Sequence, residues 1–246
     1  MTKAEIQFVR SLADKRARDE QSLFVAEGEK LVGEIRSSYL RIRKIYTSTD
    51  SLPWPEAEHV TAAEMGRISM LKTPSSVLAV VEKPHSRLDR STLGSRLTLA
   101  LDGVQNPGNL GTIIRLADWW GISDVICSED CADCFNPKVV QATMGAILRV
   151  RVHYTSLDAL LAEASAGGVP VYGTFLDGDD IYAADLTPNG IIVMGNEGRG
   201  ISDTCARHIT RRLFIPPYPR DCRGSESLNV AIATAVVCAE FRRSFS

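Results

Sequence analysis

From residue 97 onward the chain repeats one pattern of apolar and polar positions. Short apolar runs with the length of β-strands occupy residues 97–101, 124–127, 169–175, 191–194 and 213–215. Loops rich in Gly and Asn follow, and helical periodicity fills the gaps over residues 110–120, 138–148, 157–166 and 228–242. Near-continuous apolar strands that alternate with helices predict a parallel sheet covered by helices on both faces.

The first third of the chain has a different pattern. A charged helical stretch opens it, with Ile6, Phe8, Val9 and Leu12 as the apolar members. Helical spacing returns over residues 30–35, and strand-like runs occupy 42–46 and 77–81. This alternation predicts a small α/β domain over residues 1–86. The polar, aperiodic stretch 87–95 predicts a linker, and residues 96–246 form the second predicted domain.

Composition agrees with a folded protein. Of the 246 residues, 44% are hydrophobic and 24% are charged, which excludes a disordered or collagen-like chain. No stretch approaches the ~18 uncharged apolar residues of a membrane span. The first residues lack the apolar run of a signal peptide. We therefore expect a cytoplasmic protein with no membrane partner.

Charge is distributed unevenly along the chain. The formal net charge is −2, yet residues 1–44 hold ten Lys and Arg against seven Asp and Glu. A second basic cluster lies late in the sequence, at Arg207, Arg211, Arg212, Arg220 and Arg223. Local patches of this kind can steer a polyanion even on a mildly acidic protein. Solvated helix faces are the alternative interpretation.

The six cysteines do not predict a metal site. Cys131 and Cys134 form one C-x-x-C pair, and neither a second pair nor an H-x₃₋₅-H pattern follows at zinc-ligand spacing. A thioredoxin-like role would require a helix directly after the pair, but Phe-Asn-Pro follows. We expect reduced thiols that bind no metal.

Two of the predicted strands end in loops rich in glycine and asparagine. In the loop after residues 97–101, Asn109 is expected to cap the following helix, and Arg115 is a fixed cation less than two turns further on. The loop after residues 191–194 encloses Asn, Glu and Arg between three glycines. Parallel sheets bind ligands beyond the carboxyl ends of their strands. The G-x-G-x-x-G fingerprint is missing, which argues against a nicotinamide or flavin enzyme.

A third candidate segment follows the last predicted strand. It begins with Ile215-Pro216, continues through a connector, and reaches Ser-Leu-Asn before a run of small residues. Ser227 is expected to cap the final helix, with Asn229 in the first turn pointing back toward the loops. The small side chains let this helix pack closely against a neighbour.

These three segments resemble the signature motifs of the SpoU (TrmH-type) family of RNA ribose 2′-O-methyltransferases, within the SPOUT superfamily. The first motif, N-x-G-x-x-x-R, matches at Asn109, Gly111 and Arg115. The second matches at 194–198, and the third at 215–216 with 227–230. Residues 142–146 are similar to the family's intermediate helix. Residues 24–32 are similar to its amino-terminal RNA-binding domain, whose fold is related to kink-turn-binding ribosomal proteins. The connector 217–224 is longer than the family's usual link between Ile-Pro and Ser-Leu-Asn.

The resemblance implies a methyltransferase that uses S-adenosylmethionine and no metal, has a trefoil knot near its carboxyl terminus, and forms a homodimer. Its RNA substrate would be rRNA in preference to tRNA. The implied catalytic residues are Arg115, Asn109, Glu197, Ser227 and Asn229. The implied cofactor-binding residues are Thr174, Phe175, Leu176, Gly195, Asn196, Gly198, Ile215, Pro216, Leu228, Asn229 and Val230. Arg115 would act as a base or as a phosphate-binding cation, with Glu197 orienting it.

Two other functions compete with this interpretation. One is an RNA-binding protein of the same fold that has lost catalysis. The other is a magnesium-dependent phosphoryl-transfer enzyme that uses the acids of Asp177-Gly178-Asp179-Asp180. That stretch lacks a complete metal-loop spacing, so a solvated acidic turn is the preferred interpretation. Trp54, between two prolines, is expected to anchor a turn, with stacking on an RNA base as the alternative.

Overall fold

The computed structural model describes residues 1–220, 227–243 and 245. Contacts divide the chain into two compact units. The amino-terminal unit comprises Met1–His85 and Asp133–Leu148, and the carboxyl-terminal unit comprises Ser86–Ala132 and Arg149–Ser246. The division falls near the boundary predicted at residue 86. It also assigns residues 133–148, which the apolar pattern predicts as part of the second domain, to the amino-terminal unit.

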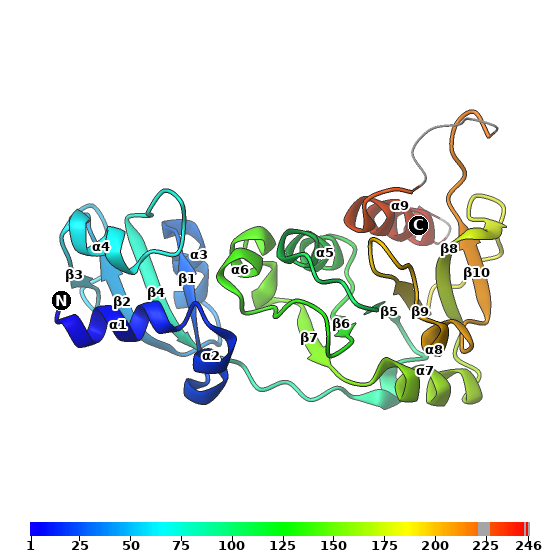
Figure 1. The fold of residues 1–246 in the computed structure, drawn as a ribbon, viewed down its shortest axis with the longest axis horizontal. Coiled ribbons are helices and arrows are strands. Elements are labelled where there is room, and N and C mark those ends of the chain that lie inside the picture. The colour runs from blue at the N-terminus through cyan, green and yellow to red at the C-terminus, as the bar shows by residue number, and fades with distance from the viewer. Residues whose placement is uncertain (221–226, 244, 246) are drawn as a thin grey trace. The chain divides into compact units, whose positions relative to one another are not determined.

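A four-stranded sheet organises the amino-terminal unit (Figure 1). Its strand order is β1 (Leu23–Glu27), β4 (Val77–Glu82), β2 (Ile42–Thr47) and β3 (Glu58–His59). The central strand β4 is antiparallel to both β1 and β2. The helical elements are α1 (Lys3–Ser11), α2 (Lys15–Gln21), α3 (Glu29–Arg36), α4 (Ala62–Ile68), α6 (Pro137–Thr143) and the short η2 (Ala146–Leu148).

Side chains on both local and distant segments stabilise this unit. Thr2 and Thr61 each close a capping box at the start of a helix. The buried Arg18 pairs with Asp133 at 2.6 Å and donates to two backbone carbonyls, which binds segment 133–148 to the unit. The guanidinium of Arg36 lies 4.7 Å from the centre of the Trp54 ring. This contact supports the turn-anchor interpretation of Trp54.

The carboxyl-terminal unit contains the predicted parallel sheet, with six strands. Its order is β10 (Arg211–Phe214), β8 (Val171–Asp180), β9 (Gly190–Met194), β5 (Leu97–Leu101), β6 (Asp124–Cys127) and β7 (Arg151–Tyr154). Every pairing is parallel. The helices α5 (Pro107–Trp119) and α9 (Val230–Arg243) lie on one face, and α7 (Leu157–Ala166) and α8 (Asp203–Ala206) on the other (Figure 1). The prediction of an α/β fold with a covered parallel sheet is therefore confirmed.

Two strands differ from the apolar pattern. The edge strand β7 is too short and polar to give a strand signal. Strand β8 continues to Asp180, and its acidic end pairs with β10 at Leu213 and Phe214 after a register shift. The expected turn is therefore wrong, because the segment is an extended strand, but Asp177 and Asp179 are exposed to solvent as expected. Cross-strand pairing of Asp177 with Arg212, at 2.6 Å, compensates one of the charges on this extended segment.

Two further segments differ in detail. Helix α6 ends at Thr143, because Met144 and Gly145 both adopt positive φ angles, so the predicted helix over 138–148 is interrupted. The predicted linker 87–95 contains a short helical turn, η1 (Arg90–Thr92), and Leu93 beside it is buried in the core of the carboxyl-terminal unit. Linker residues therefore contribute to packing.

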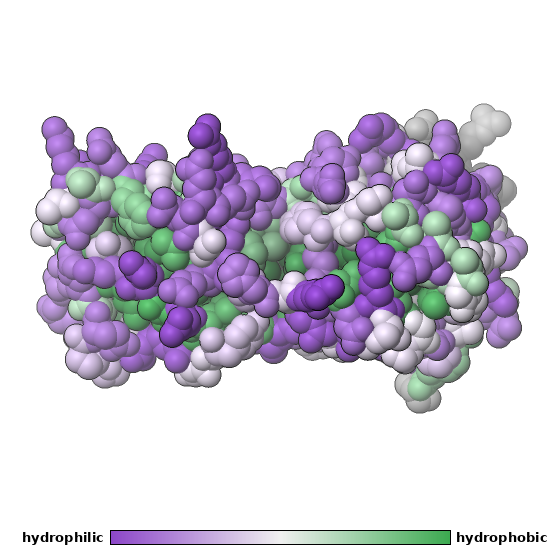
Figure 2. Space-filling view, turned by 90° about the horizontal axis from the view of Figure 1, so that it is seen from below, coloured by the Kyte–Doolittle hydropathy of each residue, from purple (hydrophilic) through white to green (hydrophobic). Residues whose placement is uncertain are grey.

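Polar residues cover most of the face shown in Figure 2, and apolar residues are visible mainly between them. Among the described residues, no helix combines the length and the apolar composition needed to cross a bilayer.

Candidate active site

The loops after β5 and β9 start side by side at one edge of the parallel sheet. Leu101 and Met194 are partners in the pairing of the two strands. The next residue, Asp102, donates its backbone N–H to the Met194 carbonyl at 2.9 Å. Further out, the Asn196 side chain donates to the carbonyl of Gly103 at 2.7 Å. The first two candidate loops are therefore joined directly.

The loop after β9 is a tight backbone turn. Asn196 and Gly200 exchange two backbone hydrogen bonds of 2.9 Å. The side-chain amide oxygen of Asn196 also accepts from the backbone N–H groups of Gly198 and Arg199, at 2.9 and 3.1 Å. Gly195 is buried, and a Cβ there would overlap the backbone of Gly200 and Ile201. Only glycine fits this position without displacing the turn.

One chain of side-chain hydrogen bonds links all three candidate segments. Asn109, in the first turn of α5, donates to Glu197 at 2.6 Å. Asn229, just before α9, donates in turn to the carbonyl oxygen of Asn109 at 3.0 Å. Asn109 uses both polar atoms of its side-chain amide: the nitrogen donates to Glu197, and the oxygen accepts from Asn229. The three segments expected to converge do so through these residues.

The helix caps differ from the expected ones. Asn106 caps α5, accepting from the N–H groups of Gly108 and Asn109 at 2.8 and 3.2 Å. Asn229, and not Ser227, caps α9 by accepting from two backbone N–H groups at 3.0 and 3.3 Å. Both predicted caps were therefore wrong. Because Asn106 takes the capping position before Pro107, the Asn109 side chain is free to bridge to Glu197 and Asn229.

Asn229 has two separable roles, and substitution distinguishes them. Asn229→Ala removes the cap, and we expect a loss of about 1 kcal/mol in the free energy of unfolding. Asn229→Asp retains a capping oxygen but cannot donate to Asn109. It should keep most of the stability while weakening the link between the motif loops. Urea unfolding followed by circular dichroism measures the first effect, and methyl transfer the second. Equal stability of the alanine variant and the unchanged protein would contradict the capping role.

The remaining predicted residues lie on the β8 and β10 side of the sheet. The Thr174 hydroxyl lies 3.8 Å from the Met194 sulfur, so the first half of β8 contacts the last residue of β9. The Arg212 guanidinium lies 3.5 Å from the centre of the Phe175 ring. Leu176 is 69% exposed. The half-buried Ile215 and Pro216 follow β10, the neighbour of β8 in the sheet.

Arg115 lies apart from these contacts. It is exposed on α5 and makes no hydrogen bond or ion pair with another described residue. The expected pairing with Glu197 is not formed, and Glu197 accepts a hydrogen bond from Asn109. Ser227 is also exposed and has no hydrogen bond to the described part of the chain, while Leu228 beside it is 50% exposed.

The late basic cluster is largely neutralised by acidic partners. Arg207 pairs with Asp158 at 2.9 Å, Arg212 with Asp177, and Arg220 with Asp180. Arg211 lies 4.0 Å from Asp185. Arg223 falls outside the described residues. This pairing leaves little free positive charge for RNA, which favours the solvated-face interpretation of these arginines.

Sequence reasoning did not find Asp102 as part of this site. Its carboxylate accepts from both the backbone N–H and the hydroxyl of Ser202, at 2.8 and 2.7 Å. These bonds hold the far end of the β9 loop against the β5 loop. An acid placed directly after a buried apolar strand is the signal that could have indicated it.

Comparison with known proteins decides the family. Residues 96–239, more than half of the chain, match the model described as the SpoU rRNA Methylase family. The chain belongs to this SpoU family. Residues 3–79 match a second model, the MRM3-like substrate binding domain. The resemblance stated from the three motifs is thereby confirmed.

Relatives of the SpoU chain cover nearly its whole length. It is 30% identical to the 23S rRNA (guanosine(2553)-2′-O)-methyltransferase RlmP of Bacillus subtilis, over 95% of this chain and 94% of that protein. A putative RNA methyltransferase of the TrmH family from Porphyromonas gingivalis has 42% identity and a TM-score of 0.87, covering 99% of both chains. The AdoMet-bound rRNA methyltransferase from Sinorhizobium meliloti has 30% identity and a TM-score of 0.86, covering 100% of this chain and 97% of that one.

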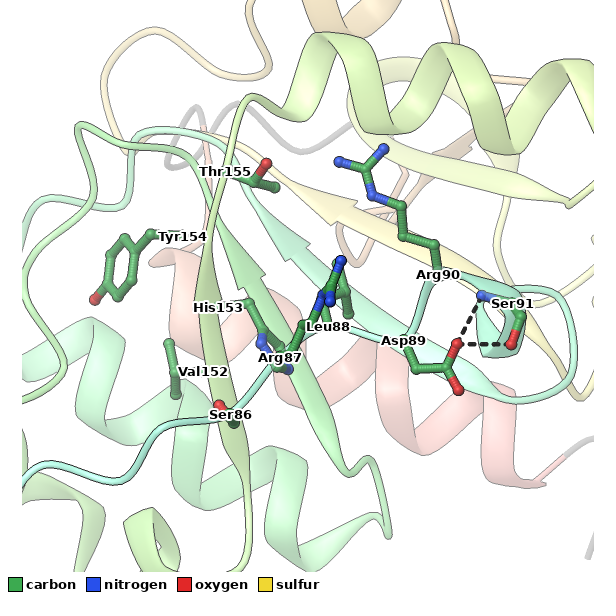
Figure 3. A pocket seen from close by; sticks show the side chains of 10 residues that line it. All are labelled: Ser86, Arg87, Leu88, Asp89, Arg90, Ser91, Val152, His153, Tyr154 and Thr155. Atoms are coloured by element: carbon green, nitrogen blue, oxygen red, sulfur yellow. Dashed lines mark hydrogen bonds between the residues drawn. The ribbon is translucent and has the colours of Figure 1, made fainter.

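A large cavity of this SpoU chain lies away from the motif loops. It measures about 920 Å³ and is lined by residues 86–91 and 152–155, none of which belongs to the three motifs (Figure 3). His153, on its wall, contacts the buried Asp124 at 2.9 Å. Burial raises the pKa of Asp124, but hydrogen bonds from Arg151 and His153 and the charges of Arg151 and Arg96 outweigh it, so this pKa lies below its usual value. We interpret this polar network as structural.

One cysteine contacts the first SpoU motif loop. The Cys131 sulfur accepts from the Val104 N–H and lies 3.2 Å from the Leu101 carbonyl oxygen. Hydrogen bonds from Cys127, Ser128 and nearby backbone groups lower the Cys131 pKa to about 7, against the effect of burial. No group of three metal-ligating residues occurs in the described part of the chain.

Cys131 should therefore be the most reactive of the described thiols near neutral pH. Alkylation by iodoacetamide follows the thiolate fraction, so its rate should rise with a midpoint near pH 7. Burial raises the pKa of Cys205 to about 11 and of Cys238 to about 12, and both should react slowly. Peptide mapping by mass spectrometry between pH 5 and 9 measures this, with Cys131→Ser as the control. A Cys131 midpoint near 9 would contradict the hydrogen-bonded thiolate.

Proposed function

We propose that this protein transfers a methyl group from S-adenosylmethionine to a ribose 2′-hydroxyl of large-subunit rRNA. The observation that carries the proposal is the Glu197–Asn109–Asn229 hydrogen-bond chain, which joins the three SpoU motifs at one edge of the sheet. Relatives over nearly the whole length are named as 23S rRNA 2′-O-methyltransferases or rRNA methyltransferases.

The residues at this edge fit S-adenosylmethionine. Leu176 and Leu228 expose apolar surface that an adenine ring can cover, and the Phe175 ring is held in place by Arg212. The turn around Gly195 brings backbone groups close together without side chains between them. Gly195, Ile215 and Leu228 would contact the adenosine through their backbone, and Thr174, Phe175 and Leu176 would line the same pocket. Bound S-adenosylmethionine supplies an activated methyl group on a positively charged sulfur.

In the reaction, the ribose 2′-oxygen would form a bond to the methyl carbon as the carbon–sulfur bond breaks; the sulfur would leave as a neutral thioether, and the hydroxyl proton would pass to solvent water. The chain must align the ribose and assist that proton loss. Arg115 has no acidic partner among the described residues, so it is free to bind an RNA phosphate and stabilise negative charge developing on the 2′-oxygen. Asn109, Glu197 and Asn229 hold the three motif segments together through their hydrogen bonds. Ser227 would supply a further hydrogen-bonding group.

The domain organisation supports an RNA substrate. We assign residues 1–86 to RNA binding, with a fold related to kink-turn-binding ribosomal proteins, residues 87–95 to a linker, and 96–246 to methyl transfer. The match of residues 3–79 to a substrate binding domain supports this division. We also assign a trefoil knot to the carboxyl-terminal part, where the loops after β9 and β10 lead to α9. An rRNA substrate would place the activity in the cytoplasm, where bacterial ribosomes assemble.

A homodimer is part of the proposal. Trp119 on α5 and Ile232 on α9 are 80% and 55% exposed. The two helices pack against each other, and because both apolar side chains are exposed they are available to a second copy. Arg115 lies one helical turn from Trp119, and a partner seated there would also surround Arg115. Sedimentation should show a dimer that Trp119→Glu with Ile232→Glu converts to a monomer.

Two measurements test the function. Calorimetric titration with S-adenosylmethionine should show one binding event per chain, whereas a pure RNA-binding protein should show no heat of binding. Mapping of ribose methylation in cells that lack the gene should reveal one missing 2′-O-methyl group in 23S rRNA. A missing group in tRNA would favour the alternative substrate. Cofactor binding without any missing methyl group would contradict the proposed reaction.

A further inference from the structure

The amino-terminal unit carries an exposed strip of one aromatic and two basic side chains. Tyr39, Arg41 and Arg43 form this strip, between the end of α3 and the first half of β2. Tyr39 is 67% exposed, and both arginines are exposed. We propose that the strip binds the RNA substrate, with the arginines on phosphates and Tyr39 stacked on an unpaired base. This inference rests on the proposed function and adds a contact surface outside the motif loops.

The sheet leaves this strip open. Strand β3 pairs with β2 only at Tyr46 and Thr47, so the first half of β2 has no described strand on that side. The register between β2 and β4 shifts between Ile42 and Lys44, which makes Arg43 the extra residue of a bulge. A bulge re-aims side chains and twists the strand locally. The side chain of Arg43 therefore does not have to follow the regular alternation of side chains between the two faces of the sheet.

Charge pairing distinguishes these arginines from their neighbours. Lys15 and Arg16 each pair with an acid one helical turn away, at 2.7 Å, and Arg36 pairs with Glu56 at 2.5 Å. Lys44, the next residue along β2, pairs with Glu58. Arg41 and Arg43 form no ion pair with any described residue. Glu82, on the neighbouring strand β4, contacts Arg41 through a backbone hydrogen bond, from its N–H to the Arg41 carbonyl at 2.9 Å.

This combination of residue types suits RNA. A guanidinium binds phosphate oxygens through a planar pair of donors and stays charged at all physiological pH values. A phosphate contact at Arg41 or Arg43 would break no existing ion pair, so the full electrostatic gain is available. Unpaired RNA bases stack on exposed aromatic rings. A basic strand with an adjacent free ring therefore favours single-stranded or looped RNA over a regular duplex.

The test compares two double variants with the same change in charge. Arg41→Ala with Arg43→Ala removes the strip cations, and Lys15→Ala with Arg16→Ala removes two paired cations from the same unit. Binding of an unmodified 23S rRNA transcript is measured at several KCl concentrations. The strip variant should bind about tenfold more weakly or worse near physiological salt, and its log–log salt slope should fall by about 1.5. The paired-cation variant should change little.

Substitution of Tyr39 tests the stacking contact separately from the phosphate contacts. Tyr39→Ala should weaken RNA binding about fivefold or more, while Tyr39→Phe, which keeps the ring, should restore it. In methyl-transfer assays the strip variants should raise KM for RNA and leave kcat and S-adenosylmethionine affinity unchanged. Thermal unfolding confirms that each variant is folded.

The outcomes separate this inference from the proposed function. If both double variants weakened RNA binding equally, net charge alone would explain the effect, and the proposal that the strip binds RNA would be contradicted. Unchanged RNA affinity in a protein that still methylates rRNA would also overturn it, while leaving the function intact. Absence of both cofactor binding and methyl transfer in the unchanged protein would instead overturn the proposed function, and strip-dependent RNA binding could still be observed.

Discussion

Replacing Arg115 with alanine is expected to lower methyl transfer to RNA by about a thousandfold, while the affinity for S-adenosylmethionine changes little. The size of this decrease in rate is typical of removing one well-placed charged or proton-transferring group from an active site. Folding should be unaffected, because the side chain is exposed and makes no described polar contact. Single-turnover kinetics with the rRNA transcript, together with calorimetry for the cofactor, measure the two quantities separately.

Two further variants sharpen this prediction. Arg207→Ala makes the same chemical change in the same unit at an arginine already paired with Asp158, and it should leave methyl transfer nearly unchanged. Arg115→Lys distinguishes a base from a phosphate-binding cation. Deprotonating an arginine with a pKa near 12.5 at pH 7 costs about 7.5 kcal/mol of free energy. We therefore expect Arg115 to act as a phosphate-binding cation. Lysine activity well above that of alanine at high pH would favour the base. Equal loss of cofactor binding and activity in Arg115→Ala would make Arg115 structural.

Replacing Gly195 with alanine is expected to weaken S-adenosylmethionine binding by at least about tenfold and to reduce methyl transfer with it. The added Cβ would overlap the backbone of Gly200 and Ile201, so the turn between β9 and α8 must open. Overpacking at a closed position costs roughly 1–3 kcal/mol. Displacement of Asn196 would then disturb its bond to Gly103 and separate the first two motif loops. Calorimetric titration measures the loss of affinity.

Two other glycines serve as comparisons for this prediction. Gly198, in the same loop, has its nearest atom 3.7 Å from the position of an added Cβ, so Gly198→Ala should be milder. Gly66, in helix α4, has only Pro74 at 4.0 Å, and Gly66→Ala should leave cofactor affinity unchanged. Wild-type affinity in Gly195→Ala would show that the turn can relax and that its close packing is not required for binding.

The sequence alone determined the class of fold and the family. Buried parallel strands contain few polar residues, so their positions are visible as apolar runs, and all five predicted runs lie largely within observed strands of the sheet. The motif spacing needed no tertiary information, because each motif is a local pattern at the end of one element. The convergence of the loops followed from the rule that parallel strands present their carboxyl ends at the same edge.

The tertiary structure alone decided how polar side chains pair. The Asn109–Glu197 and Asn109–Asn229 bonds join residues 88 and 120 positions apart, and the Arg18–Asp133 pair joins residues 115 apart. Periodicity reports which face of an element is buried, but not which distant group meets it. The same limit explains the acidic end of β8, whose extended form depends on pairing with β10. The two wrong helix caps have a different cause, because capping bonds are local: both helices begin after another asparagine than the residue expected, Asn106 for α5 and Asn229 for α9.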